Sequence, residues 1–180
     1  MTVSELRPVR RVMLIFPPMH DIRHVDTMVC PPMGIASLAA HIRDRVEVGL
    51  LDCLAEAGVH RVAISEKIER VGLPYDDILA RIRAFAPDMV GLSCIFSSQF
   101  SCVTEIARRV KQEIDPEMIV VTGGTHPSFL PETTLKHTYI DYVVLGEGEL
   151  GLERLIDAHN SGGRIEDIDG IAFRTKSGVQ

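Results

Sequence analysis

Five short runs of apolar residues recur along the chain and predict strands that are buried on both faces. The first run covers residues 11–16 and ends at Pro17 and Pro18, which cannot continue a β-ladder. Continuous hydrophobicity of this kind is typical of strands in parallel sheets, where helices cover both sides. The other four runs cover residues 46–51, 89–93, 118–122 and 140–145.

Amphipathic segments lie between these runs and predict the covering helices. Apolar positions recur at helical spacing in residues 34–45, 75–85 and 98–114, and in a segment that starts near Leu150. Because strands alternate with helices, right-handed crossovers place the helices on both faces of one sheet. We therefore expect an α/β fold with a flavodoxin-like (Rossmann-like) open parallel sheet of five strands. Residues 168–174 predict an additional strand at the C-terminal edge.

Two segments do not fit this alternation. Residues 19–33 predict one long loop, and loops of this length inside a compact domain are usually functional or mobile. Residues 53–73 show no clear pattern, so no element is predicted there.

Length and composition describe one globular domain over residues 1–180. The hydrophobic fraction of 46% is enough for one core, and the net charge of -6 disfavours nucleic acid as a partner. No apolar run approaches the roughly 20 residues that a membrane span needs, so we expect no membrane partner and a cytoplasmic location. The cysteines lack the spacing of a zinc or iron–sulfur site, and we expect mostly buried thiols. They are Cys30, Cys53, Cys94 and Cys102.

Small residues stand at the carboxyl ends of two predicted strands, where open parallel sheets bind their ligands. Ser93 ends one strand, and Gly123 and Gly124 follow the next. A small hydroxyl residue beside two residues without side chains predicts a narrow slot that accepts a long, flat cofactor tail. Each also has a simpler explanation, because Ser93 can bond neighbouring backbone and the glycines can merely turn the chain.

Residues 146–151 match the Gly-x-Gly-x-x-Gly pattern of dinucleotide sites. Glu147 and Glu149 place negative charge where a pyrophosphate would lie, which disfavours that assignment. The chain also lacks a Walker-type phosphate loop. Pro17-Pro18 and Ser93 stand where a phosphoacceptor receiver domain needs carboxylates. A flavin or nucleotide module on the same fold stays open as an alternative.

Several segments, taken in their order and spacing, resemble the cobalamin-binding domain at the N-terminus of B12-dependent radical S-adenosylmethionine (SAM) enzymes. The resemblance covers essentially the whole chain. It implies that the Ser of a Ser-x-Leu element and a later Gly-Gly pair line the slot for the dimethylbenzimidazole tail. Ser93 and Gly123-Gly124 match these positions, with Ile95 in place of Leu. The segments that carry the resemblance are residues 16–18, 32–39, 90–93, 123–127, 141–149 and 168–172.

By this resemblance, loop residues at the strand ends form the cofactor site, and no catalytic residue is expected. His126 is expected to be a loop residue that contacts the corrin amides. The expected cofactor-binding residues are Pro17, Pro18, Ser93, Ile95, Phe96, Ser97, Ser98, Gly123, Gly124, Thr125, His126, Pro127, Gly146, Glu147 and Gly148.

One departure from other B12 domains concerns cobalt. Many of those domains carry Asp-x-His-x-x-Gly after the first strand, and the His binds cobalt while the Asp orients it. The segment from His20 to His24 does not fit, because the His lies three residues after Asp21. We therefore expect base-off cobalamin without histidine ligation, its lower face covered by Phe96, Ser97 or water. His20 or His24 is the less favoured alternative as a cobalt ligand.

The resemblance also implies a larger enzyme, in which this chain is the cofactor module. The chain would bind methylcobalamin or hydroxocobalamin without catalysing a reaction by itself. A radical SAM catalytic domain, beyond residue 180 or on a separate polypeptide, would hold SAM and a 4Fe-4S cluster. Methyl transfer is the expected overall reaction. A stand-alone corrinoid carrier for a separate methyltransferase or isomerase is the alternative. Because the chain ends in a predicted turn at residues 176–178, we expect the natural polypeptide to continue.

Overall fold

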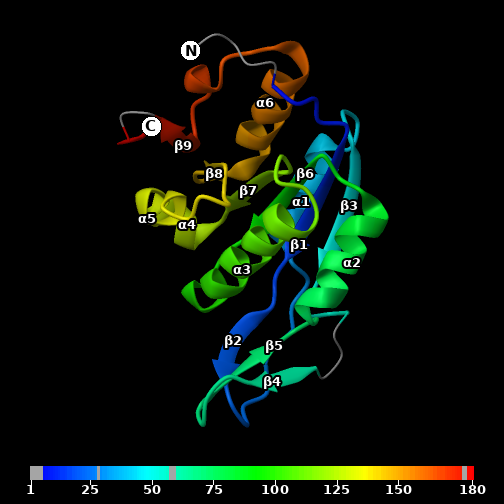
Figure 1. Cartoon of the computed structure of the whole chain (residues 1–180), viewed down its shortest axis with the longest axis vertical. Coiled ribbons are helices and arrows are strands. Elements are labelled where there is room, and N and C mark those ends of the chain that lie inside the picture. The colour runs from blue at the N-terminus through cyan, green and yellow to red at the C-terminus, as the bar shows by residue number, and fades with distance from the viewer. Residues whose placement is uncertain (1–5, 28, 57–59, 176–177) are drawn as a thin grey trace.

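A mostly parallel sheet lies at the centre of the fold (Figure 1). The computed structural model describes residues 6–27, 29–56, 60–175 and 178–180. Within these residues the sheet has seven strands in the order β10-β9-β8-β7-β6-β1-β3. The five parallel strands are β3 (Glu47–Asp52), β1 (Arg11–Phe16), β6 (Met89–Ser93), β7 (Ile119–Gly123) and β8 (Tyr142–Val144). Their order confirms the flavodoxin-like prediction.

Two antiparallel strands extend the sheet beyond β8. The strand β9 (Ile171–Thr175) pairs with β8, and β10 (Gly178–Val179) pairs with β9. The predicted additional strand is therefore present, but it begins three residues later than expected. It is also not the outermost strand, because β10 covers it. Two residues of the predicted turn, 176 and 177, lie outside the described residues.

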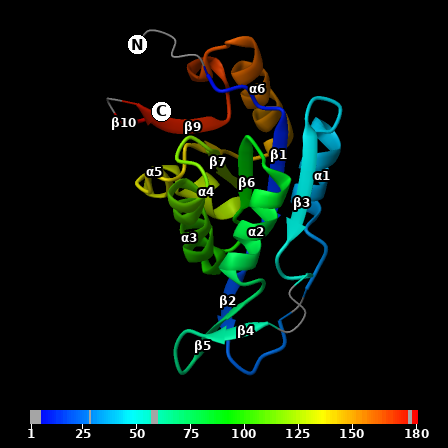
Figure 2. The same cartoon turned by 45° about the vertical axis from the view of Figure 1, so that its right-hand side comes forward.

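Helices cover both faces of the sheet. α1 (Met33–Ile42) and α6 (Gly148–Ser161) lie on one face, and α2 (Tyr75–Phe85) and α3 (Ser97–Glu113) lie on the other. Figure 2 shows α1 on the opposite side of β1 and β3 from α2 and α3. Alternate residues of β1 therefore enter separate cores: Leu14 packs in the α1–α6 core, and Ile15 packs in the α2–α3 core. This double burial explains the continuous apolar runs.

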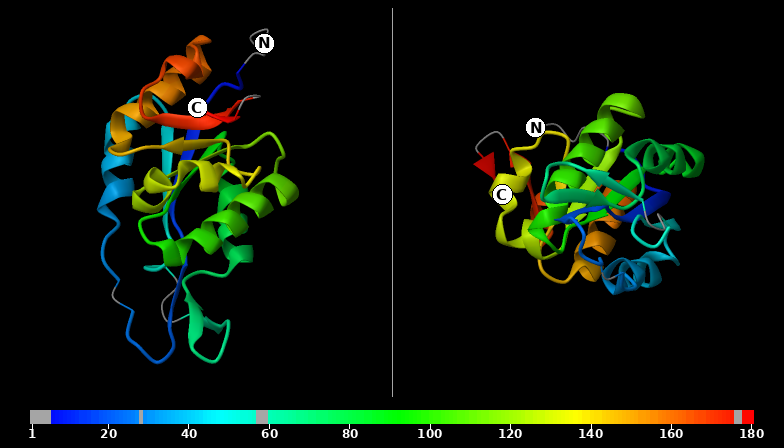
Figure 3. Two further views of the ribbon diagram at one scale, coloured as in Figure 1. Left: turned by 90° about the vertical axis from the view of Figure 1, so that its left-hand side faces the viewer. Right: turned by 90° about the horizontal axis from the view of Figure 1, so that it is seen from below.

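A small antiparallel sheet was not predicted. It has the order β2-β5-β4, formed by β2 (Met19–Ile22), β5 (Ile68–Val71) and β4 (Arg61–Ala63). Figure 3 shows it at the carboxyl end of the central sheet, where β2 continues the chain from β1. The prediction of one loop over residues 19–33 is wrong for β2. These strands are short and partly polar, so they carry no apolar run.

Two short helices connect β7 to β8, namely α4 (Thr125–Phe129) and α5 (Pro131–Leu135). The expected loop residues Thr125, His126 and Pro127 therefore lie in a helix, which corrects the prediction for them. A 3₁₀ turn, η1 (Ile165–Asp167), precedes β9. Short helices of this length show too few periodic positions to be predicted from sequence.

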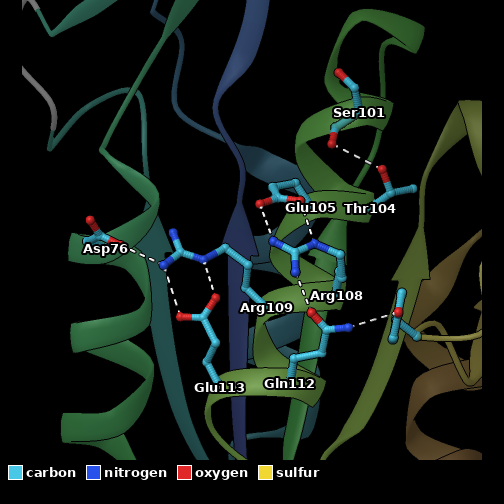
Figure 4. Close-up of polar contacts among 9 residues, drawn as sticks. Asp76, Ser101, Thr104, Glu105, Arg108, Arg109, Gln112 and Glu113 are labelled. Carbon is cyan, nitrogen blue, oxygen red and sulfur yellow. Dashed lines mark hydrogen bonds and ion pairs between the residues drawn. The ribbon is translucent and has the colours of Figure 1, made fainter.

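An ion pair joins α2 to α3 on the outer surface (Figure 4). The Arg109 guanidinium donates hydrogen bonds to Glu113 at 2.7 Å and to Asp76 of α2 at 2.6 Å. These contacts hold the pKa of Glu113 below its usual value, with the Arg109 hydrogen bond as the main cause. Because Asp76 and Glu113 are exposed, these pairs contribute little to the stability of the fold.

Asp88 joins three strands where β6 begins. Its carboxylate accepts hydrogen bonds from the backbone N–H groups of Arg10 and Arg11, at 2.8 and 3.0 Å. Its own N–H donates to the carbonyl of Arg11, and its carbonyl accepts from the N–H of Ile119. This one residue therefore sets the register of β1, β6 and β7.

Replacing Asp88 with alanine should lower the free energy of unfolding by about 1–2 kcal/mol, because two backbone N–H groups lose their acceptor. Urea unfolding measures the change. The matched control is Asp169→Ala, since Asp169 is exposed and should change stability by less than about 0.5 kcal/mol. Equal stability of the two variants would contradict the role given to Asp88.

Candidate cofactor site

A cavity of about 170 Å³ opens at the carboxyl edge of the sheet, on the face that α1 and α6 cover. Its mouth is formed by the ends of β6, β7 and β8, and its inner part reaches Leu14 and Gly91 in the middle of their strands. Seven of the residues predicted for the cofactor line it: Ser93, Ile95, Gly123, Gly124, Gly146, Glu147 and Gly148. Their roles toward a cofactor stay predictions.

The register of the strands explains why this face is hollow. Gly91 pairs with Val121, and Ser93 pairs with Gly123, so all four face the same side of the sheet. Two of these positions have no side chain, and Ser93 has only a hydroxymethyl group. On the opposite face, Val90, Leu92 and Val120 fill the core completely. The sheet is therefore packed on one side and depressed on the other.

Gly123 ends β7 and Gly124 follows it, and a side chain would have different effects at the two positions. Gly124 has a φ of +108°, and a Cβ there would lie 2.8 Å from the carbonyl oxygen of Cys94. A Cβ on Gly123 would lie 3.4 Å from the Val144 oxygen, which is ordinary contact. The backbone therefore requires glycine at 124, whereas glycine at 123 only keeps the cavity open.

The Ser93 hydroxyl has no hydrogen-bond partner among the described residues. The nearby Thr122 differs, since its hydroxyl donates to the carbonyl of Leu92 at 2.8 Å on the other face of the sheet. The simpler explanation of Ser93, a bond to neighbouring backbone, is therefore not what the structure shows. A partly exposed hydroxyl at the cavity wall is available to a ligand.

Several cavity residues were missed by sequence reasoning. Gly91 carried a usable signal, because a glycine inside an apolar strand indicates a close approach, and it lies two residues before Ser93 on the same face. The helical residues gave none, since Ile35, Leu38 and Leu152 have the spacing of ordinary core positions. The missed residues are Leu14, Gly34, Ile35, Leu38, Gly91, Leu92, Val121, Thr122, Val144, Glu149 and Leu152.

Eight predicted residues lie outside the cavity lining. Pro17 and Pro18 are buried where β1 passes into β2, and Phe96 is 54% exposed before α3. Ser97 and His126 contact each other, with Ser97 Oγ 2.9 Å from His126 Nδ1. Ser98, Thr125 and Pro127 adjoin this pair in α3 and α4.

Gln99 was not predicted, although it shapes the loop beside the cavity. It is fully buried, and its Oε1 accepts hydrogen bonds from the backbone N–H groups of Ile95 and Phe96, at 3.0 and 3.1 Å. Gln99 therefore fixes the segment that follows Ser93.

The two candidate cobalt ligands do not line the cavity. His20 lies in β2, with its Nδ1 3.3 Å from Ser101 Oγ. Burial, with a smaller contribution from the Arg70 charge, lowers the pKa of His20 below its usual value. His24 is exposed in a turn with a φ of +65°. No group of three or more His, Cys, Asp or Glu residues within the described chain could hold a metal ion.

Polar contacts hold together α1 and α6, the helices that roof the cavity. Their residues are four positions apart in the sequence and lie at the surface, and Arg45 follows the end of α1. The Ser37 hydroxyl donates to Glu149 and is the main reason that the pKa of Glu149 lies below its usual value. The contacts are Ser37–Glu149 at 2.6 Å, His41–Glu153 at 2.6 Å, Arg45–Asp157 at 3.1 Å and Arg45–Glu153.

The acidic residues at the mouth differ in their surroundings. Glu147 precedes α6 and is exposed, and its side chain makes no capping hydrogen bond. Glu149 lies in the first turn of α6, where a carboxylate is favoured by the helix dipole. The carboxylate of Glu149 is thus held by Ser37 of α1, and the carboxylate of Glu147 is free to face a ligand.

The chain belongs to the B12 binding domain family, which matches residues 19–156. It is 32% identical to an uncharacterized methyltransferase of Pyrococcus horikoshii over 96% of this chain and 34% of that protein. It is 30% identical to cytidylyl-2-hydroxyethylphosphonate methyltransferase of Streptomyces wedmorensis over 97% of this chain and 33% of that protein. The chain thus spans about a third of the length of these relatives.

Solved structures of two radical SAM enzymes share the fold. OxsB, with aqua-cobalamin and S-adenosylmethionine bound, matches with a TM-score of 0.72 at 20% identity, over 96% of this chain and 22% of OxsB. TsrM from Kitasatospora setae, with cobalamin and a 4Fe-4S cluster bound, matches with a TM-score of 0.71 at 22% identity, over 95% of this chain and 28% of TsrM. Within the described residues, no helix has the length and apolar character of a membrane span.

The glycine pair gives a direct test of the site geometry. Gly124→Ala should lower the free energy of unfolding by about 2–3 kcal/mol, because its φ is unfavourable and its Cβ meets the Cys94 carbonyl. Gly123→Ala is the matched control and should cost less than about 1 kcal/mol. Urea unfolding of both variants checks this, and the reverse ranking would refute the geometry.

Proposed function

We propose that this chain binds cobalamin in a base-off state, with the nucleotide tail in the cavity beneath α1 and α6. The observation that carries the proposal is the unpaired Ser93 hydroxyl beside Gly123 in a cavity at the carboxyl edge of the sheet. This arrangement occurs in a chain of the B12 binding domain family.

The residues present fit such a tail. The cavity is narrow and its inner wall is aliphatic, with Leu14, Val121, Val144 and Leu152 on its surface. An engineered apolar cavity of about 150 Å³ binds benzene, so this volume is suited to an aromatic base. The roof helices and the depressed sheet would enclose the base from both sides.

The corrin ring would then lie across the strand ends, outside the cavity. Phe96 and the Ser97–His126 pair adjoin this edge, together with Glu147 at the mouth. When bound, cobalamin supplies a cobalt-held methyl group. The chain itself would position the ring and exclude other molecules from its lower face.

Histidine ligation of cobalt is not part of the proposal. His20 of β2 lies beside Ser101 of α3, His24 is exposed in a turn, and the segment from His20 to His24 lacks the Asp-x-His-x-x-Gly pattern. We therefore infer that Phe96, Ser97 or water covers the lower face.

We further propose that residues 1–180 are one cofactor module of a radical SAM methyltransferase. The two relatives described above are named as methyltransferases, and the two similar structures are radical SAM enzymes about three or more times as long as this chain. In this proposal, the remaining part of the protein binds SAM and a 4Fe-4S cluster and generates the radical. A stand-alone corrinoid carrier is the second candidate, and it predicts a cobalt-bound histidine instead.

Reconstitution with hydroxocobalamin tests binding and ligation together. We expect one corrinoid per chain and an absorption spectrum without base or imidazole coordination. His20→Ala and His24→Ala should leave this spectrum unchanged. Loss of an imidazole signature in either variant would refute the His-off proposal and favour the carrier.

Filling the cavity tests the position of the tail. Gly123→Val should weaken cobalamin binding by about tenfold or more, since overpacking costs about 1–3 kcal/mol. Cobinamide, which has the corrin ring without the nucleotide, is the control ligand and should bind both proteins equally. Equilibrium dialysis gives both dissociation constants. An unchanged affinity for cobalamin would place the tail elsewhere.

A further inference from the structure

A polar cluster lies between the small sheet and the first turns of α2 and α3. His20 of β2 and Arg70 of β5 are paired in register, so they lie side by side on one face of the small sheet. His20 Nδ1 is 3.3 Å from Ser101 Oγ of α3. The guanidinium carbon of Arg70 lies 4.2 Å from the centre of the ring of Tyr75, the first residue of α2. None of these four residues lines the cavity beneath α1 and α6.

Arg70 carries a positive charge that no carboxylate balances. Within the described residues Arg70 forms no ion pair, whereas Arg61 of the same small sheet pairs with Glu69. The contacts of the Arg70 guanidinium are with Tyr75, an uncharged side chain. Its Nε is buried and has no hydrogen-bond partner in the described part of the chain. Because a partly buried charge without a partner costs free energy, this position suits a site whose anion comes from a ligand.

The surroundings of His20 show the same local excess of positive charge. Burial, followed by the Arg70 charge, lowers the pKa of His20, and no carboxylate is among the causes. Arg70 from β5 and Ser101 from α3 face the imidazole, and Tyr75, which is bonded to Cys102, lies against Arg70. A carboxylate near His20 would raise its pKa instead. The cluster is therefore locally positive in a chain whose net charge is -6.

The cluster offers hydrogen-bond donors that a small ligand can reach. Arg70 and His20 are partly buried, and Ser101 is exposed. Their donors are the guanidinium N–H groups, one imidazole N–H and one hydroxyl. A phosphoryl or phosphonyl group has three terminal oxygens and can pair with all three side chains, whereas a carboxylate has two oxygens. The number of donors therefore favours a phosphoryl or phosphonyl group.

We propose that Arg70, His20 and Ser101 form a binding site for the phosphoryl or phosphonyl group of a small molecule. Arg70 supplies the charge and its terminal N–H groups, and His20 and Ser101 supply one donor each. The site lies at the carboxyl end of the central sheet, beside α2 and α3 (Figure 3). The cavity proposed for the nucleotide tail lies on the other face, beneath α1 and α6. The inference goes beyond the proposed function and does not depend on it.

Titration of the 180-residue chain without cobalamin tests the site directly. The probes are inorganic phosphate and methylphosphonate, with acetate at the same ionic strength as the carboxylate control. The measured quantity is the position of the imidazole NMR signal of His20, which a His20→Gln variant identifies. We expect a saturable shift with phosphate and methylphosphonate, and a Kd for acetate at least about fivefold higher, since one hydrogen bond fewer is formed. A His20 signal that does not move, or equal Kd values for acetate and phosphate, would overturn the proposal.

Substitution of Arg70 separates a specific site from general attraction of anions. Arg70→Gln should weaken phosphate binding by about tenfold or more, because hydrogen bonds between charged groups are lost. Arg70→Lys keeps the charge without the planar fork and should recover only part of the affinity. The matched control is Arg43→Gln, since Arg43 is exposed after α1, at the other end of the sheet. It changes the net charge equally and should change the Kd less than about twofold. Equal weakening by both glutamine variants would contradict the assignment.

Ser101→Ala is a second variant, in which the substitution lies on the exposed surface of α3 and leaves Arg70 in place. It should weaken phosphate binding about fivefold, the value of one hydrogen bond. An unchanged Kd would overturn the place of Ser101 in the site, even where Arg70→Gln fails to fold.

Hydroxocobalamin distinguishes this site from one for the phosphodiester of the nucleotide tail. Saturation with hydroxocobalamin should change the Kd for phosphate less than about twofold, because the two sites lie on opposite faces of the central sheet. Loss of phosphate binding would show that the tail occupies the cluster and would overturn the proposal. If the chain binds phosphate through Arg70 but binds no corrinoid, the proposed function fails and this inference stands.

Discussion

The missing side chains on one face of two adjacent strands are the constraint on which the rest of the structure depends. Gly91 and Gly123 lie on β6 and β7 and face the same helices, with Ser93 paired to Gly123. A Cβ on Gly91 would lie 2.6 Å from Leu14 Cδ2, so Leu14 already occupies the space that a side chain there would need. The surface beneath α1 and α6 is therefore filled by Leu14 at Gly91 and is open toward the carboxyl edge, at Ser93 and Gly123.

The glycine positions of β6 and β7 give α1 and α6 fewer apolar contacts. Contacts in other parts of the structure compensate for this loss. The opposite face of the same strands is fully packed, with Val90, Leu92 and Val120 buried against α2 and α3. Polar contacts between α1 and α6 hold the roof at its outer side, where they do not enter the cavity. The cavity thus lies between a fully packed core on the α2–α3 side of the sheet and the contacts that join α1 to α6.

The alternating helices and strands could be predicted because their signal is local. A strand buried on both faces is apolar throughout, and the helices from residue 75 to 85 and near 98 to 113 show clear periodicity. The small sheet could not be predicted, since its strands are held by distant partners. Arg61 pairs with the buried Glu69 across that sheet, and His20 contacts Ser101 of α3. Neither contact leaves a pattern within its own strand.

Some residues of the candidate site could be predicted from the sequence, and others could not. Residues at strand ends, such as Ser93 and Gly124, could be proposed because parallel sheets bind ligands at that edge. Residues deeper in the cavity depend on the register of β1, β6 and β7, which is fixed by contacts such as those of Asp88. Register is not visible in one sequence, so Leu14 and Val121 could not be assigned to the cavity wall rather than to an ordinary core.

Most titratable side chains around the cavity are buried or already hydrogen-bonded. Burial raises the pKa of Cys94 to about 12, so this neighbouring thiol stays protonated and is not a nucleophile at neutral pH. His126 is engaged by Ser97 and packs against the Phe100 ring at 4.4 Å, and Glu149 is committed to Ser37. Apart from Glu147, which is exposed at the mouth, these side chains are used to hold the loops and the helices α1 and α6 in place. What the cavity offers to a ligand is an aliphatic surface, the Ser93 hydroxyl and the exposed Glu147 at its mouth.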